Sequence, residues 1–253
     1  MVFEKYAQYY DLLYQDKNYQ SETDFILCLL NKYHPECEKI LEFGSGSGIH
    51  GRLLANAGLK VSGIEISQQM INLGLSSIQR NDKNTNFSCT LGDCTSTFIG
   101  DHFEAVISLF HVLSYQTSNE KVIAMLKNAH KQLIPGGIFI FDYWYAPAVW
   151  NIGPALRIKR VTNEELAITR IADPECFLRQ NLIKVNYQTF IKDLKTNHIS
   201  EIQETHEMRA FTTEEIGDFA NQTGFRVVQS AEWMTGCTPS TETWGIFTIL
   251  EKI

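Results

Sequence analysis

The sequence predicts an α/β protein with a doubly wound, mostly parallel sheet, and three observations indicate this fold class. Short apolar segments alternate with helix-length amphipathic segments over the first 150 residues, and a glycine-rich turn directly follows the first apolar segment. After residue 150 the pattern changes to long segments that alternate apolar and polar residues. Alternating strands and helices imply crossover connections and a parallel sheet buried on both faces. Period-two alternation is typical of antiparallel strands with one solvated face, so an antiparallel insertion is expected.

The elements of the first half can be predicted in order. The expected strands cover 39–43, 60–66, 87–93, 103–110 and 138–144. A first helix is expected over 49–57 and is ended by Gly58. A second begins after Ser67, its expected N-cap, and a third covers 119–133. The PGG sequence at 135–137 is expected to break the chain before the fifth strand.

The second half predicts an antiparallel meander between Arg157 and Arg209, followed by a return to the first fold. A helix is expected over 211–225 with Thr212 or Thr213 as its cap, and the last two strands pair as a hairpin at the sheet edge. The expected organisation is an N-terminal helical cover (1–37), a core (38–150 and 211–253) and an antiparallel insertion (151–210).

Composition excludes several classes of function. A net charge of −7 argues against nucleic-acid binding, which needs a basic surface. The sequence holds no apolar run of membrane-spanning length and no signal-peptide core at its start, so a cytoplasmic protein without membrane association is expected. The six cysteines form no CxxC pair, and even Cys89 and Cys94 lack histidines at ligand spacing, so we expect reduced thiols and no metal.

The glycine-rich segment ILEFGSGSGIHG (40–51) fits two ligand classes. Gly46, Gly48 and Gly51 satisfy GxGxxG, and Glu65 follows at about the spacing of a dinucleotide site. This interpretation makes the protein an NAD(P)-dependent oxidoreductase.

The second pattern is ExGxGxG, formed by Glu42, Gly44, Gly46 and Gly48. A carboxylate before the loop suits a ligand that carries an ammonium group, whereas it would repel a pyrophosphate. Asp93 ends the third strand at the sheet edge where open α/β sheets bind ligands. These features favour a cationic nucleoside over a dinucleotide.

Taken in order, ILEFGSGSG, VSGIEIS, LGDCT, FEAVISLFHVLSY and QLIPGGIFIFDYW resemble the class I S-adenosylmethionine-dependent methyltransferases. The resemblance covers about 38–145 and 211–253 and implies a seven-stranded, Rossmann-like sheet. It implies that the glycines and Glu42 hold the methionine part of the cofactor, and that Glu65 accepts both ribose hydroxyls. The adenine contacts it implies come from Ile66, Met70 and Asp93, with Cys94 close by, and Leu109 is a further expected cofactor contact. Met70 could instead be core packing, and Glu65 and Asp93 solvated loop carboxylates.

The segment YAQYYDLLYQDKNY, with FHVLSY and FDYWYAPAVW, resembles a subgroup of small-molecule methyltransferases that includes amino-sugar N-methyltransferases. This resemblance implies that an N-terminal helix covers the cofactor and that its tyrosines, above all Tyr10 and Tyr14 and also Tyr6, reach the methionine end and the acceptor. The alternative is an amphipathic helix that docks by its aromatic face.

Methyl transfer to a small polar acceptor needs alignment, exclusion of water and an electron-rich pocket. The expected acceptor edge carries several aromatic residues: Tyr115, Tyr143, Trp144, Tyr145 and Trp150. Candidate catalytic residues are His111, as a base or a substrate contact, with Tyr14 and Tyr143. Asp142 either orients the acceptor amine or caps a turn.

The remaining histidines and the insertion have simpler interpretations. His50 is expected in a structural or cofactor-proximal role, and His198 and His206 are expected to face solvent. The insertion is expected to be a lid over the acceptor pocket or a homodimer interface. A protein that binds the cofactor without catalysis is a further alternative. The acceptor atom and the number of methyl groups cannot be predicted.

Overall fold

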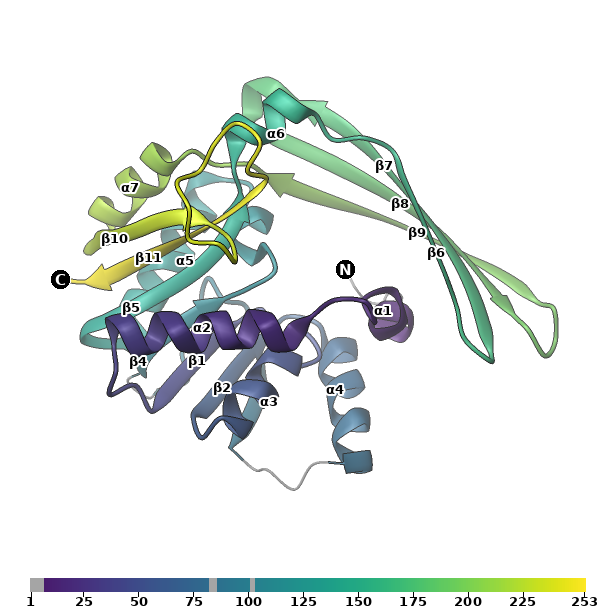
Figure 1. Ribbon diagram of the computed structural model, residues 1–253, viewed down its shortest axis with the longest axis horizontal. Coiled ribbons are helices and arrows are strands. Elements are labelled where there is room, and N and C mark those ends of the chain that lie inside the picture. Colours follow the sequence, from purple (N-terminus) through teal and green to yellow (C-terminus); the bar gives the residue numbers. More distant parts are fainter. Residues whose placement is uncertain (1–6, 82–85, 101–102) are drawn as a thin grey trace.

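The computed structural model describes residues 7–81, 86–100 and 103–253, and these residues form two sheets (Figure 1). The larger sheet has the strand order β10-β11-β5-β4-β1-β2-β3. Its strands are β1 (Lys39–Phe43), β2 (Lys60–Glu65), β3 (Phe87–Leu91), β4 (Phe103–Ser108), β5 (Leu133–Trp144), β10 (Phe225–Glu232) and β11 (Gly245–Lys252). The pairs among β1 to β5 are parallel, and β10 and β11 add an antiparallel hairpin. The predicted doubly wound sheet and its edge hairpin are confirmed.

Helices cover both faces of this sheet. The helices are α1 (Ala7–Leu13), α2 (Tyr19–Tyr33), α3 (Ile49–Asn56), α4 (Gln68–Asn81), α5 (Asn119–Gln132), α6 (Ala146–Ile152) and α7 (Thr213–Gln222). Apolar side chains of α5 and α7 share one buried cluster with the strands, and those of α2 and α3 share another. Burial of both faces explains why the strands read as short continuous apolar runs.

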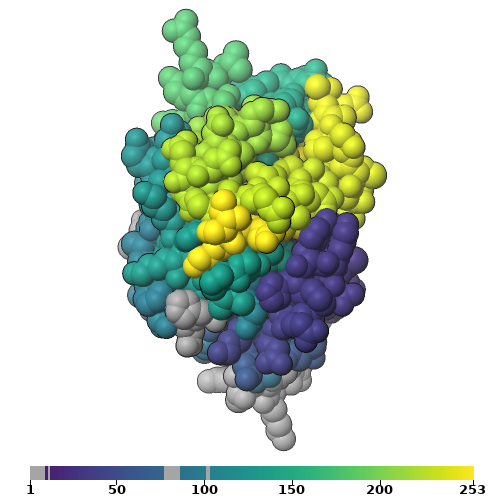
Figure 2. All heavy atoms as spheres, turned by 90° about the vertical axis from the view of Figure 1, so that its left-hand side faces the viewer, coloured from purple at the N-terminus to yellow at the C-terminus, as the bar shows by residue number. Residues whose placement is uncertain are grey.

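The N-terminal and C-terminal parts of the chain pack together on one side of the core. Phe25 of α2 meets Trp233 and Phe247 edge to face, with ring centroids 5.3 Å apart in each pair. Figure 2 shows the α2 region, in purple, lying against the yellow C-terminal segment. These contacts fix α2 on the core as a permanent layer.

Local sequence signals account for most helix boundaries. Ser67 accepts a hydrogen bond from the backbone N–H of Met70, as expected of an N-cap. Thr212 caps α7 in a capping box with Glu215, which settles the choice between Thr212 and Thr213. One boundary was predicted wrongly, because β5 begins at Leu133 and continues through the PGG sequence. The irregular register between β4 and β5 absorbs the left-handed Gly136 without ending the strand.

The insertion is a separate antiparallel sheet that projects from the core (Figure 1). Its strands are β6 (Arg157–Thr162), β7 (Leu166–Phe177), β8 (Leu182–Asp193) and β9 (Ile199–Arg209). Leu13 of α1 is buried with Ile168 and Ile191 of the inner face of this sheet. We call this sheet the lid, because it encloses, together with α1, the space above the core.

Candidate active site

A cleft of about 830 Å³ lies between the core, α1 and the lid. Most residues predicted for the site line it: Tyr10, Tyr14, Glu42, Gly44, Gly46, Glu65, Ile66, Met70, Asp93, Cys94, Leu109 and His111. Apart from Tyr10 and Tyr14 of the N-terminal segment and Met70 of α4, they come from the carboxyl ends of the parallel strands and the loops that follow, which is where open α/β sheets bind ligands. The short sequence motifs therefore do converge in space.

The glycine loop after β1 exposes its backbone to this cleft. Gly44 has φ +68°, and a Cβ there would lie 2.6 Å from Val112 Cγ2, so this position accepts only glycine. The carboxylate of Glu65 accepts hydrogen bonds from Gly46 N and from Ser67 N, both at 2.8 Å. Glu65 thus holds the loop as well as facing the cleft. Gly48 does not line the cleft: it is the left-handed N-cap of α3 and packs against Phe87.

Glu42 brings a buried acid to the same end of the cleft. Its side chain is 2% exposed, and its Oε2 has no hydrogen-bond partner among the described residues. Burial, with the neighbouring charge of Glu65, raises the pKa of Glu42 to about 8. A buried carboxylate oxygen without a hydrogen bond is costly, and a ligand ammonium group would satisfy it. The bare loop and this acid fit the amino-acid end of S-adenosylmethionine.

His50 connects Glu42 to the N-terminal cover. Its Nδ1 lies 4.0 Å from Glu42 Oε1, and its Nε2 lies 2.8 Å from Oε2 of Glu22 on α2. Burial opposes ionisation of Glu22, but its contacts with His50 and Lys17 outweigh that effect and lower its pKa. His50 is therefore close to the cofactor end of the cleft and also ties α2 to α3, as its two predicted roles require.

The opposite wall of the cofactor end is apolar. Ile66 is 52% exposed although it is a large apolar residue, while Met70 is buried and its Cε lies near Gly46. Asp93 accepts two hydrogen bonds from Thr95 at 2.7 and 2.8 Å. Burial raises the pKa of the Cys94 thiol to about 12, so this group stays neutral. An exposed apolar side chain beside a carboxylate suits a flat base with an amino group.

His111 stands at the acceptor end in a strained backbone. Phe110 and His111 both have left-handed φ values, +67° and +63°, which non-glycine residues rarely adopt. Asp142 stabilises this turn, because its Oδ1 accepts a hydrogen bond from His111 N at 3.0 Å. Asp142 Oδ2 lies 2.8 Å from His111 Nδ1, although the angle falls outside hydrogen-bond geometry. Asp142 thus positions the histidine, a role different from both roles expected of it.

Aromatic side chains surround His111. The cleft is lined there by Tyr14, Phe110, Tyr115, Trp144, Tyr187 and Trp244. The rings of Tyr14 and Phe110 meet edge to face at 5.2 Å, and Arg170 of the lid donates to the Tyr14 hydroxyl at 3.2 Å. Such walls attract a cation and exclude water.

The structure contradicts the catalytic role predicted for Tyr143. Its side chain is fully buried in the core and bonds to Thr248 Oγ1 at 3.1 Å, and burial raises the pKa of its phenol. Neighbouring strand residues point to opposite faces, so Trp144 reaches the cleft while Tyr143 and Tyr145 do not. Trp150 packs at the base of the lid instead. Tyr6 lies outside the described residues.

The prediction for His206 was also wrong. His198 is exposed as expected, but His206 is 3% exposed and lines the cleft. The residues that the lid contributes, Arg157, Tyr187, His206 and Met208, carry no local motif. Only the period-two pattern of the strands could have suggested which of them point inward.

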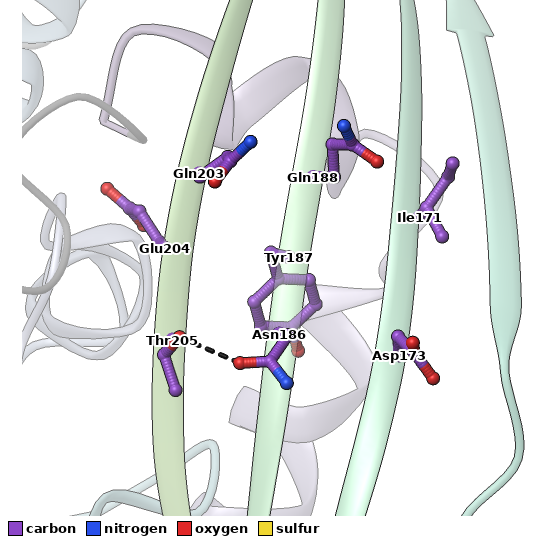
Figure 3. A pocket seen from close by; sticks show the side chains of 8 residues that line it. All are labelled: Ile171, Asp173, Asn186, Tyr187, Gln188, Gln203, Glu204 and Thr205. Carbon is purple, nitrogen blue, oxygen red and sulfur yellow. Dashed lines mark hydrogen bonds between the residues drawn. The ribbon is translucent and has the colours of Figure 1, made fainter.

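A second, shallower pocket of about 400 Å³ lies on the lid (Figure 3). Its side chains are mainly amides and carboxylates, and Thr205 donates a hydrogen bond to Asn186 at 2.8 Å. The described residues contain no group of three or more histidine, cysteine, aspartate or glutamate side chains able to hold a metal. In the same residues, no helix is long and apolar enough to span a membrane.

The fold and the site together define a class of protein. Residues 40–137 match the methyltransferase domain family. The protein is a class I S-adenosylmethionine-dependent methyltransferase, and S-adenosylmethionine is its cofactor. The alternative as an NAD(P)-dependent oxidoreductase finds no support in the comparisons with known proteins.

Curated relatives share a quarter of the sequence or less. The chain is 25% identical over 211 residues to a dTDP-3-amino-3,6-dideoxy-α-D-glucopyranose N,N-dimethyltransferase of Streptomyces fradiae, covering 83% of this chain and 79% of that protein. It is 24% identical to the putative methyltransferase YqeM of Bacillus subtilis, covering 100% and 98%. A dTDP-3-amino-3,4,6-trideoxy-α-D-glucopyranose N,N-dimethyltransferase of Streptomyces venezuelae is 25% identical over 150 residues, covering 58% and 61%.

Solved structures confirm the fold over the whole chain. An S-adenosylmethionine-dependent methyltransferase from Clostridium acetobutylicum superposes with a TM-score of 0.80 at 16% identity, covering 100% of this chain and 99% of that one. CalS10, an amino pentose methyltransferase from Micromonospora echinaspora solved with bound S-adenosylmethionine, gives 0.76 at 20% identity, covering 100% and 98%. The lid is therefore part of a recurring architecture.

Proposed function

We propose that this protein transfers a methyl group to the amine of a small amino sugar. The observation that carries the proposal is the His111–Asp142 pair, held by strained backbone in an aromatic pocket at one end of the cofactor cleft. An acceptor amine that arrives protonated must lose that proton before its lone pair can attack the methyl group, and a histidine oriented by a buried carboxylate is suited to accept it. Three relatives whose names carry amino sugars or amino pentoses add support from outside the chain.

The cofactor end of the cleft holds its ligand through three kinds of contact. We assign the ammonium group to Glu42, the ribose hydroxyls to Glu65 and the adenine to Ile66 and Asp93. When bound, S-adenosylmethionine supplies an electrophilic methyl group on a positively charged sulfur. The protein residues align the acceptor with that methyl group and exclude water, which is where most of the rate advantage of such a reaction comes from.

The acceptor end orients and deprotonates the amine. We assign the proton to the His111 ring, which lies 23% exposed beside the cleft while Asp142 behind it is buried. Tyr14, directly after α1, and Trp144 of β5 flank this position. Their electron-rich faces stabilise the positive charge that develops on the amine during transfer.

The test is a methylation assay with matched sugar nucleotides. The probes are dTDP-3-amino-3,6-dideoxy-α-D-glucose, its 3,4,6-trideoxy counterpart, and a dTDP-6-deoxyhexose with a hydroxyl in place of the amine. Mass spectrometry should detect a methyl group on the amine probes and none on the hydroxyl probe. Equal methylation of the hydroxyl probe, or none of any amine by protein that binds S-adenosylhomocysteine, would contradict the proposal.

A further inference from the structure

The lid carries a second histidine–carboxylate pair that the proposed chemistry does not use. On β9, His206 and Glu204 are two residues apart and therefore point to the same face of the lid. They stand opposite Val185 and Tyr187 of β8. This inner face borders the cleft, which Tyr187 and His206 both line.

A chain of contacts joins this pair to the core. The hydroxyl of Tyr115 lies 2.8 Å from His206 Nδ1, and His206 Nε2 lies 3.4 Å from Glu204 Oε2. The Tyr187 ring packs against the His206 ring edge to face at 4.8 Å. Tyr115 belongs to η1 (Val112–Tyr115), the short turn that begins directly after His111. The chain therefore runs from the lid to the immediate neighbourhood of the proposed base.

The chemistry of the three groups sets the direction of these hydrogen bonds. An ionised carboxylate only accepts hydrogen bonds, so Glu204 favours the tautomer of the neutral ring with its proton on Nε2. Nδ1 then carries a lone pair, and the Tyr115 hydroxyl donates to it. Burial raises the pKa of Tyr115 well above its usual value, so the phenol keeps the single proton that this bond uses.

Because the Tyr115 hydroxyl donates its one proton to His206, it can only accept hydrogen bonds from other groups. Tyr115 lines the cleft, so a ligand there meets an oxygen that prefers a hydrogen-bond donor. We infer that Tyr115, oriented by His206 and Glu204 of the lid, positions a 3-amino sugar by accepting a hydrogen bond from its C4 hydroxyl, on the carbon beside the reacting amine. This inference rests on the proposed function.

Two probes from the methylation assay separate this role from a structural one. They differ by one hydroxyl beside the amine, present in dTDP-3-amino-3,6-dideoxy-α-D-glucose and absent from the 3,4,6-trideoxy sugar. We expect Tyr115→Phe to raise KM for the hydroxyl-bearing probe by about tenfold, as for one lost hydrogen bond. The kcat and the affinity for S-adenosylhomocysteine should change little, and KM for the deoxy probe should stay the same.

Variants of the lid test the orienting role. His206→Asn keeps a carbonyl acceptor near the position of Nδ1 and should preserve the preference for the hydroxyl-bearing probe, whereas His206→Leu should abolish it. Tyr145→Phe is the matched control, because Tyr145 packs against the core outside the cleft. An unchanged preference in Tyr115→Phe would overturn the inference, because a merely structural tyrosine would alter both probes alike.

The His206 tautomer that orients the Tyr115 hydroxyl can also be measured without a sugar substrate. Nitrogen-15 NMR of the His206 ring should show the proton on Nε2 in the wild-type protein, and Glu204→Gln should weaken that preference. A proton on Nδ1 in the wild type would overturn the inference whatever the kinetics. Failure of the wild-type enzyme on both amine probes would instead contradict the proposed function, leaving the NMR result to decide the orientation of Tyr115.

Discussion

Glu42 is a carboxyl group whose charge state should depend on the cofactor. Burial raises its pKa to about 8, so the free protein holds it mostly protonated at neutral pH. A ligand ammonium group favours the ionised form. We therefore expect binding of S-adenosylhomocysteine, which keeps that ammonium group, to release close to one proton per site at about pH 7.

Calorimetry in two buffers with different ionisation enthalpies measures this release directly. The observed binding enthalpy should differ between the buffers for the wild type and agree for Glu42→Gln, which cannot ionise. A wild-type enthalpy that is independent of the buffer would show that the ammonium group lies elsewhere.

The same pKa shift gives the pH dependence of stability in the free protein. The folded state holds the Glu42 proton up to about pH 8, whereas the unfolded state loses it near 4.5. Between these values the folded state binds more protons, so the free energy of unfolding should fall as the pH rises. Denaturant titrations across this range should show a smaller fall for Glu42→Gln, and equal slopes would contradict the assignment.

Substitutions at His111 and Asp142 should lower the rate of methyl transfer without changing the affinity for the cofactor. His111→Gln removes the proton acceptor, and we expect a loss of kcat of about 10²–10⁴-fold with little change in affinity for S-adenosylhomocysteine. Asp142→Asn keeps the ring but weakens its orientation, so a smaller loss is expected. Single-turnover rates and calorimetry measure the two effects, and full activity in His111→Gln would remove this residue from the chemistry.

Residue roles that depend on a local motif could be predicted from the sequence. Glu42 lies in β1, Gly44 directly follows this strand and Glu65 ends β2, so their proximity follows from that spacing. Roles that depend on which way a strand residue points could not be predicted. Tyr143 and His206 were misplaced because one register step exchanges the core face for the cleft face.

At the scale of elements, α3 is held close to β3 by a glycine. A Cβ at Gly51 would lie 2.3 Å from the Phe87 ring and 2.8 Å from Glu42 Oε2. We expect Gly51→Ala to lower the free energy of unfolding by about 1–3 kcal/mol through overpacking, and to weaken cofactor binding by displacing Glu42. Combining it with Phe87→Leu should restore part of the free energy of unfolding, because the smaller side chain leaves room for the Cβ at position 51.

Gly217 provides the matched control for this prediction. It lies inside α7, and a Cβ there would meet no atom within 4 Å. Gly217→Ala should therefore stabilise the protein by up to about 1 kcal/mol, the gain in helix propensity. Denaturant unfolding measures both variants, and a Gly51→Ala protein as stable as the wild type would contradict the close packing of α3 against β3.

Elements with strong caps and periodicity were predicted well, and the exceptions have physical causes. The capping box of α7 is a local signal, so its start could be predicted. The early start of β5 could not, because β4 pairs with Leu133 across an irregular register and keeps the glycines within the strand. That pairing is a tertiary effect that overrides the local preference of PGG for a turn.

At the scale of the whole molecule, the cofactor site unites segments that are far apart in sequence. The core supplies the glycine loop, and Tyr10 of α1 and Tyr14 directly after it line the same cleft, while Leu13 of α1 is buried against the lid. The period-two pattern predicted an inserted sheet, yet the burial of α1 beneath it depends on contacts between distant residues such as Leu13 and Ile168. A ligand in the cleft should therefore order α1 as well as the loop.

This coupling predicts a measurable stabilisation by the demethylated cofactor. At a free concentration of S-adenosylhomocysteine one hundred times its Kd, linkage adds about 2.7 kcal/mol to the free energy of unfolding. For a chain of this size that corresponds to a rise in Tm of about 5–10 °C. Hydrogen exchange should slow most in α1 and the glycine loop and least in α7, none of whose residues lines the cleft. NAD⁺ at the same concentration should leave Tm unchanged, because it has no ammonium group to pair with the buried carboxyl of Glu42. Protection confined to the glycine loop would show that α1 is not part of the cofactor site, and an equal shift with NAD⁺ would contradict the role of Glu42.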